Sequence, residues 1–309
     1  MLRIASWLRR IREQLTTGHL EAKSEAFYKL FPRDIKIKRV ATGFNFTEGP
    51  VWFAEEKYLL FSDIPANKIL KLTFYGQVTV FRWSSGNSNG LTRDKQGRLI
   101  ACEHSNRRVT RTEIDGSITV LADRFQGKKL NSPNDVVVKS DGAIYFTDPP
   151  YGIKPDQQEQ TIQGVYRLFP ETKELILVAD DFDGPNGLAF SPDESKLYID
   201  DSASSCRHVR VFDVEADGSL SNGQIFHSMN IIKPGTPDGM KVDAYGHIYC
   251  TGPGGVWVFD PEGNHLGTIV TPEIPANCAW GDDDLKSLYI TAYTSIYKLR
   301  VNIPGIKVP

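Results

Sequence analysis

Short runs of alternating apolar and polar residues, separated by turn-forming residues, make up most of this chain. In one unit, the β-branched run 136–138 is followed by the turn 140–142 and the alternating run 143–147. Runs of this length and period, joined by a tight turn, predict two antiparallel strands. A second pair follows in most copies, as in runs 108–112 and 117–121, which an Asp-Gly pair connects. The pattern therefore predicts a chain of short antiparallel strands.

The two-strand unit recurs six times along the chain. Just before the first strand of every copy stands a side chain that carries an oxygen atom. These residues are Glu48, Asn89, Asn134, Asn186, Asp238 and Asn277. Their spacings are 41, 45, 52, 52 and 39 residues, and such lengths are typical of four-stranded propeller blades. The repeat predicts an all-β fold, a six-bladed β-propeller.

The last copy of the repeat is incomplete, because no clear strand follows run 296–300. The alternating run 35–40 lies upstream of the first copy and is available to fill that place. Closure of a ring by the other end of the chain protects the sheet edges that an open array would expose. We therefore divide the chain into an N-terminal helical extension, residues 1–30, and a propeller, residues 31–309.

The first 25 residues show helical rather than strand periodicity, with arginines between the apolar positions. The apolar members are Leu2, Ile4, Trp7, Leu8, Ile11 and Leu15. This spacing predicts an amphipathic helix, which either packs on the ring or makes peripheral contact with a membrane surface; a disordered tail is the third interpretation. The segment has no uninterrupted apolar run that would make a signal peptide or a membrane span.

Bulk composition narrows the class of protein. The formal net charge of −2 argues against a nucleic-acid-binding groove. The four cysteines are Cys102, Cys206, Cys250 and Cys278, and their spacing fits no zinc motif. Reduced, mostly buried thiols are the simplest interpretation and favour a cytoplasmic location. The sequence leaves monomer and dimer open.

The six oxygen-bearing residues are expected to meet at one end of the central axis, because the first strand of each propeller blade lines that axis. Turn formation alone explains the Asn-Gly and Asp-Gly pairs, but it does not explain Glu48. A bound cation would offset the charges of Glu48 and Asp238, and Asn134 and Asn186 would add amide oxygens. Ligation by oxygen alone favours Ca²⁺, although Mg²⁺, Mn²⁺, Zn²⁺ or Fe²⁺ would also fit.

Residues that follow the second strand of each blade should surround the same point. Among them, His104 is a candidate to move a proton or to bind a substrate hydroxyl; a histidine held only by neighbouring acidic residues is the alternative. Tyr151 follows two prolines and is expected to form a wall of the substrate site. Asp63, Asp148 and Asp201 are more simply interpreted as strand-end caps than as ligands.

Five segments, in this order and spacing, resemble the SMP-30/gluconolactonase/regucalcin-like family. They are Glu-Gly-Pro-Val-Trp at 48–52, Asn-Ser-Pro-Asn-Asp at 131–135, Phe-Thr-Asp-Pro at 146–149, Gly-Pro-Asn-Gly-Leu-Ala-Phe at 184–190 and Pro-Asp-Gly-Met at 237–240. The resemblance runs from about Lys38 to Leu299, and segment 103–109 is similar to the gluconolactonase branch.

The resemblance implies a divalent metal at the axis, held by Glu48, Asn186 and Asp238, with Asn134 beside it in contact with ion or substrate. Some mammalian relatives have an arginine two residues before that asparagine. This chain has Ser132 there, so sugar-lactone recognition by such an arginine is not carried over.

The resemblance implies a small-molecule lactone as the substrate, and the residues suit its hydrolysis. A divalent metal polarises a carbonyl and lowers the pKa of bound water, and Asp238 is the candidate general base. Asn134, His104 and Tyr151 are the candidate substrate-binding residues. Two alternatives stay open: hydrolysis of organophosphate esters at the same metal site, and a calcium-binding propeller without catalysis.

Overall fold

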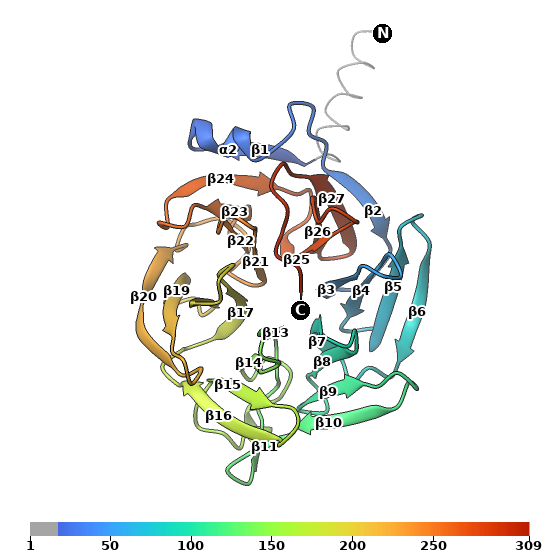
Figure 1. The fold of residues 1–309 in the computed structure, drawn as a ribbon, viewed down its shortest axis with the longest axis vertical. Coiled ribbons are helices and arrows are strands. Elements are labelled where there is room, and N and C mark those ends of the chain that lie inside the picture. The colour runs from blue at the N-terminus through green and yellow to red at the C-terminus, as the bar shows by residue number, and fades with distance from the viewer. Residues whose placement is uncertain (1–17, 309) are drawn as a thin grey trace.

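A computed structural model describes residues 18–308 of the chain. These residues form a ring of six antiparallel sheets around a central axis (Figure 1). The six-bladed all-β architecture expected from the repeat is therefore confirmed. The amphipathic helix expected from the apolar residues between 2 and 15 lies outside the described residues.

The blades follow one another along the chain, each running from an inner strand at the axis to an outer strand at the rim. Blade 1 contains β3 (Thr47–Phe53), β4 (Tyr58–Asp63), β5 (Lys68–Thr73) and β6 (Val78–Trp83). Blade 2 contains β7 (Ser88–Arg93), β8 (Leu99–Glu103), β9 (Arg108–Thr112) and β10 (Ile118–Ala122). Blade 3 contains β13 (Val136–Val138), β14 (Ile144–Asp148), β15 (Gly164–Phe169) and β16 (Glu174–Ala179).

The second half of the ring repeats this order. Blade 4 contains β17 (Pro185–Phe190), β18 (Lys196–Asp201), β19 (His208–Val214) and β20 (Leu220–Ser228). Blade 5 contains β21 (Met240–Val242), β22 (Ile248–Gly252), β23 (Gly255–Phe259) and β24 (His265–Val270). Blade 6 contains β25 (Pro275–Gly281), β26 (Ser287–Ala292), β27 (Ser295–Arg300) and β2 (Lys38–Thr42).

Strand β2 closes the ring from the N-terminal side. It pairs antiparallel with β27, with Lys38 opposite Lys298 and Thr42 opposite Ser295. The expected closure is confirmed, although the strand covers residues 38–42 rather than 35–40. Upstream, β1 (His19–Ala22) pairs with β24 and gives blade 5 a fifth strand.

The remaining elements are short. Helix α2 (Glu25–Lys29) packs Phe27 into the core beside blades 5 and 6. The two-residue strands β11 (Arg124–Phe125) and β12 (Lys128–Lys129) form a small hairpin, and η1 (Pro155–Gln157) is one turn of 3₁₀ helix. No helix within residues 18–308 is both long and apolar enough to cross a bilayer.

Burial follows position in the blade. Inner strands β3 and β7 are buried at every residue, whereas the outer strand β6 alternates between half-buried and exposed residues. Strands covered on both faces read as near-continuous apolar or small residues, and rim strands keep the period of two. The core lies between neighbouring blades, as where Val51 of blade 1 contacts the cluster that contains Leu91 of blade 2.

The four cysteines are free thiols, and Cys102, Cys250 and Cys278 are buried while Cys206 is partly exposed.

The C-terminal segment after β27 turns inward to the central axis of the propeller (Figure 1). Gly305 forms a β-bridge with Asp243 there. Its Cα packs so closely on Trp280 that a Cβ would lie 1.8 Å from the indole Cγ.

Candidate metal and substrate site

The inner strands deliver the six oxygen-bearing residues to one end of the axis. In four of these strands the ladder register shifts at the site end, at Glu48/Val51, Ser88/Leu91, Pro185/Leu188 and Pro275/Asn277. Such bulges re-aim a side chain and end the pairing. In the other two, pairing of β13 and β21 begins only after the polar residue. The polar residue of each blade therefore lies at a register shift or just outside the regular pairing.

Glycines after the polar residues let the blades approach closely. A Cβ on Gly187 would lie 1.9 Å from the Asp238 carbonyl oxygen, and one on Gly239 would lie 1.9 Å from Asn277 Cγ. Real Cβ atoms do not come so near other atoms, so these positions have room only for glycine. The local sequence thus explains why the polar side chains meet at the axis and why the neighbouring blades pack so closely there.

Hydrogen bonds between the side chains link five of the six residues in two groups. Asn277 Nδ2 donates to Glu48 Oε2 at 3.0 Å. Asn89 Nδ2 donates to Asn134 Oδ1 at 2.5 Å, and Asn134 Nδ2 in turn donates to Asn186 Oδ1.

The Asp238 carboxylate lies near both groups, because the Asn186 side chain lowers its pKa and the Glu48 charge raises it. Together these contacts connect residues as far apart in the chain as Glu48 and Asn277. The structure therefore brings together all four residues that the sequence analysis names as ligands.

Glu48 and Asp238 form a pair of carboxylates that compete for ionisation. Glu48 is only 2% exposed, and burial together with the nearby Asp135 charge raises its pKa to about 7. Burial and the Glu48 charge also raise the pKa of Asp238 well above its usual value. Two carboxylates that share one buried site cannot both ionise without a compensating charge.

Two further carboxylates stand at the axis, and the sequence analysis did not select them as site residues. Asp135 and Asp200 are both buried, and burial is the main cause that raises the pKa of each. Asp200 Oδ1 has no hydrogen-bond partner among the described residues. The Lys241 ammonium acts on Glu48 and Asp135 from the same inner strand as Met240 and lowers the pKa of both carboxyls, against the burial that raises them.

The donor set fits a hard divalent cation. It combines two carboxylates with amide oxygens, which are the ligand types that Ca²⁺ and similar ions prefer. The fit rests on this mixed set, since no three His, Cys, Asp or Glu side chains cluster at ligating distance within residues 18–308. Glu48, Asn186 and Asp238 are the residues that could hold such an ion.

His104 contacts the group of hydrogen-bonded amides formed by Asn89, Asn134 and Asn186. Its Nε2 is 3.1 Å from Asn134 Oδ1, and the side chain is almost completely buried. Burial lowers the pKa of His104 to about 4, while the contact with Asn134 acts in the opposite direction. The imidazole is therefore neutral at physiological pH. Donation to Asn134 Oδ1, which can only accept, requires the His104 proton on Nε2, whereas the longer 3.4 Å contact with Asn89 Nδ2 would require it on Nδ1.

Tyr151 stands at the rim of the site, with 48% of its surface exposed. Its hydroxyl donates to the Gly184 carbonyl at 3.1 Å. Burial of the ring and the charges of Asp200 and Asp238 raise the pKa of the hydroxyl, which stays protonated. This placement suits a wall of the mouth.

The aspartates interpreted as caps accept backbone N–H groups, which confirms that interpretation. Asp63 accepts from Asn45 and Phe46, and Asp201 accepts from Ala203. Asp148 accepts from Asn131 N at 2.7 Å.

The geometry can be set beside known proteins. A family model described as the SMP-30/gluconolactonase/LRE-like region matches residues 46–294. A gluconolactonase of Zymomonas mobilis is 33% identical over 317 aligned residues, which cover 94% of this chain and 88% of that protein.

Solved structures give the same relationship. A gluconolactonase of Xanthomonas campestris superposes with a TM-score of 0.85 at 36% identity, covering 91% of this chain and 94% of the other. A calcium-binding regucalcin of Agrobacterium tumefaciens, at 19% identity, shares the fold with a TM-score of 0.75 and coverage of 88% and 95%.

Proposed function

Because this chain belongs to the SMP-30/gluconolactonase/LRE-like family, we propose that it is a metal-dependent lactonase that hydrolyses a sugar-type (aldono-) lactone to the hydroxy acid. The observation that carries the proposal is the meeting of Glu48, Asn186 and Asp238 at one end of the axis, where burial raises the pKa of both carboxyls and the Glu48 charge raises that of Asp238 further. Relatives above 30% identity that cover nearly the whole chain bear the name gluconolactonase.

Glu48, Asn186 and Asp238 would hold one divalent cation, for which Ca²⁺ is the favoured candidate. When bound, such an ion polarises a carbonyl group and lowers the pKa of water. Its two positive charges would also offset the mutual repulsion of the two carboxylates. Regucalcin, a calcium-binding protein with the same fold, supports this choice of ion.

We assign Asp238 as the group that accepts the proton of the attacking water. The water oxygen bonds to the lactone carbonyl carbon, the bond from that carbon to the ring oxygen breaks, and the ring oxygen leaves as a hydroxyl after taking up a proton. A general base must be ionised to accept a proton, and a bound cation would keep the Asp238 carboxyl ionised against the burial that raises its pKa.

Asn134, His104 and Tyr151 are assigned to the substrate. The Asn134 amide and the Tyr151 hydroxyl are uncharged hydrogen-bonding groups, as is the neutral His104 imidazole. Uncharged donors and acceptors match the hydroxyl groups of a sugar lactone. Asn134 Nδ2 donates to Asn186 Oδ1, which holds the Asn134 amide beside a residue assigned to the metal.

Acid release from a panel of lactones, measured with a pH indicator before and after chelation, tests the proposal. We expect aldonolactone hydrolysis that EDTA removes and Ca²⁺ restores. Hydrolysis of a fluorophosphate but no lactone would instead assign the site to organophosphates. Calcium binding without turnover of any panel member would leave a calcium-binding propeller and refute the lactonase.

Asp238→Asn is the matched test of the base. We expect it to abolish hydrolysis while the melting temperature stays within a few degrees of wild type. Asp243→Asn is the control, because Asp243 is a buried aspartate at the other end of the same inner strand and hydrogen-bonds His247 instead. Wild-type turnover by Asp238→Asn would refute the role of Asp238 as base.

A further inference from the structure

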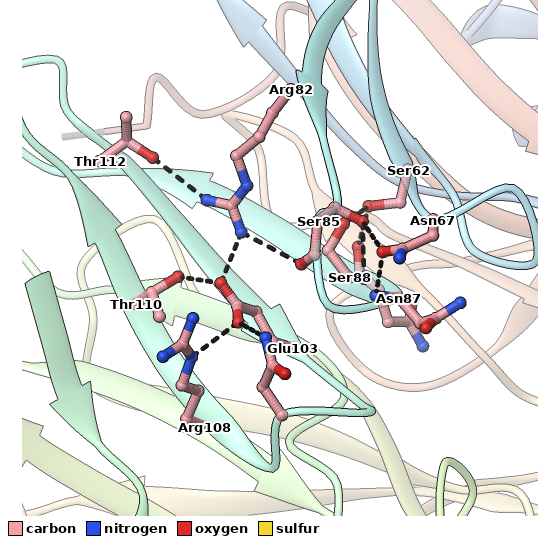
Figure 2. Close-up of polar contacts among 12 residues, drawn as sticks. Ser62, Asn67, Arg82, Ser85, Asn87, Ser88, Glu103, Arg108, Thr110 and Thr112 are labelled. Carbon is pink, nitrogen blue, oxygen red and sulfur yellow. Dashed lines mark hydrogen bonds and ion pairs between the residues drawn. The ribbon is translucent and has the colours of Figure 1, made fainter. Parts of the chain in front are cut away.

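Segment 103–108 contains a carboxylate with an unusual number of donors. The Glu103 side chain is only 1% exposed and accepts from two arginines. Its donors are Arg82 Nη2 at 2.5 Å, Arg108 Nε at 2.7 Å, Thr110 Oγ1 at 2.9 Å and Asn106 Nδ2 at 2.6 Å. Figure 2 shows the carboxylate enclosed by Arg82, Arg108 and Thr110. Charge-assisted bonds of this kind are short, and they hold a buried carboxylate in one place.

The Glu103 contacts join two blades. Arg82 belongs to β6 of blade 1, and it also donates to the Ser85 carbonyl at 3.1 Å. The loop after β6 is thereby pinned against the loop after β8. Asn87 of the first loop accepts from Ser105 Oγ at 2.7 Å and from His104 N at 3.4 Å. The backbone of His104 is therefore fixed from the blade 1 side.

Arg107 fixes the same loop from the blade 3 side. Its Nε donates to the Leu130 carbonyl at 2.7 Å, and its Nη1 donates to the Gln157 carbonyl at 2.8 Å. Leu130 begins the segment that leads to Asn134. The loop that carries His104 is thus tied at one end to Glu103 and at the other to the approach to Asn134.

The contacts of Glu103 and Arg107 hold the loop at both ends, and close packing also restricts movement of the His104 imidazole. A Cβ on Gly152 would lie 2.5 Å from His104 Cβ and 2.8 Å from its Cγ, so the loop after Tyr151 presses directly on the ring. On the opposite side, Nε2 reaches Asn134 Oδ1 at 3.1 Å.

We propose that Glu103 is a positioning residue for lactone hydrolysis: it fixes His104 so that Nε2–H is donated to Asn134 Oδ1, and this bond orients the Asn134 amide toward Asn186 and the substrate. The proposal rests on the proposed function for its consequence in turnover. The claim that Glu103 fixes the position of His104 does not depend on the proposed function. Glu103 acts through His104 and does not touch the substrate.

Glu103→Gln tests the proposal, because it keeps the shape of the side chain and removes the charge that the arginines hold. Glu113→Gln is the matched control. Glu113 also bridges two arginines, Arg98 and Arg111, at the other end of β9. We expect kcat to fall about 10- to 100-fold in Glu103→Gln, as for a small misplacement of a catalytic group, and to stay unchanged in Glu113→Gln.

A double-mutant cycle with His104→Ala shows whether Glu103 acts through His104. If it does, adding Glu103→Gln to His104→Ala costs little further activity, because coupled residues are not additive. A purely structural Glu103 would lower kcat by the same factor in both backgrounds. That multiplicative result, or wild-type kcat in His104→Ala, would overturn the proposal.

An NMR measurement of the His104 imidazole gives a second readout that needs no turnover. We expect a fixed Nε2-protonated tautomer in wild type and averaged tautomers in Glu103→Gln. If wild type hydrolyses no lactone, the proposed function fails while this measurement still decides the positioning. Arg82→Gln, which removes one of the two arginines that hold the Glu103 carboxylate, serves if Glu103→Gln does not fold. Unchanged imidazole signals in both variants would refute the positioning role.

Discussion

If the axial residues hold the proposed divalent cation, its removal should make the free energy of unfolding fall as the pH rises. The carboxyl of Glu48 has a pKa of about 7 in the folded protein, against an ordinary value of 4.5, because it is buried and lies near Asp135. The unfolded chain therefore loses this proton near pH 4.5, whereas the folded chain keeps it to about pH 7. Between these values the folded state binds more protons, so its stability falls as the pH rises.

The size of the effect follows from the shift. The two pKa values, 4.5 and about 7, correspond to about 3 kcal/mol of lost stability above pH 7, at about 1.4 kcal/mol per pKa unit. For a chain of this length the unfolding entropy converts this loss into about 5 °C of melting temperature. A bound cation removes the loss, because it holds Glu48 ionised at a favourable site. The gap between metal-loaded and metal-free protein should therefore widen by that amount between pH 5 and pH 8.

Differential scanning fluorimetry in EDTA and in excess Ca²⁺, at each pH, measures this gap directly. Subtracting the two curves removes the contribution of carboxylates that titrate alike in both forms. Glu48→Gln is the control, and it should show a gap that varies much less with pH. A gap that is constant or shrinks as the pH rises from 5 to 8 in wild type would show that Glu48 is not part of a cation site.

Three further substitutions have expected outcomes. Gly239→Ala places a methyl group against Asn277, so we expect about 1–3 kcal/mol of lost stability and weakened Ca²⁺ binding by calorimetry; unchanged affinity would contradict the tight packing. Gly305→Ala collides with Trp280 at the other end of the axis, and should lower the melting temperature by several degrees while kcat of the folded protein is retained. Lys241→Met removes the ammonium that offsets the axial carboxylates, so Ca²⁺ should bind about tenfold more tightly while the melting temperature in EDTA falls; weaker binding would contradict this charge balance.

The sequence was sufficient to predict the architecture, because the number and spacing of the repeats determine the number of blades and their order in the ring. Six copies with the spacing of a blade and a strand-like run before the first copy are enough to predict a closed ring, and pairing of Lys38 with Lys298 confirms the closure. Strand ends were less readable. Run 35–40 became strand 38–42, because pairing with β27, rather than local alternation, decides where β2 begins.

The candidate site was only partly readable. A column of polar residues predicted the convergence that includes Glu48 and Asp238, but Asp135 was overlooked because it directly follows a column member. The sequence did contain a signal for it, because four of the six copies have glycine at that position and Asp135 interrupts this pattern. Asp200 stands among the strand-end residues expected to surround the metal, but nothing in the sequence distinguished it from the neighbouring cap Asp201. Only the fold shows that its carboxylate is buried among others.

The charge balance at the axis explains why protons and a cation should compete there. Four carboxylates, those of Glu48, Asp135, Asp200 and Asp238, influence one another's ionisation, and Lys241 is the cation that acts on two of them. With no further cation, burial favours keeping protons on the carboxyls whose pKa is raised. A divalent ion must displace those protons, because carboxylate ligands bind metals in the ionised form. Repulsion among the axial carboxylates destabilises the metal-free protein and favours binding of a cation. Occupancy of the site and the stability of the fold should therefore change together.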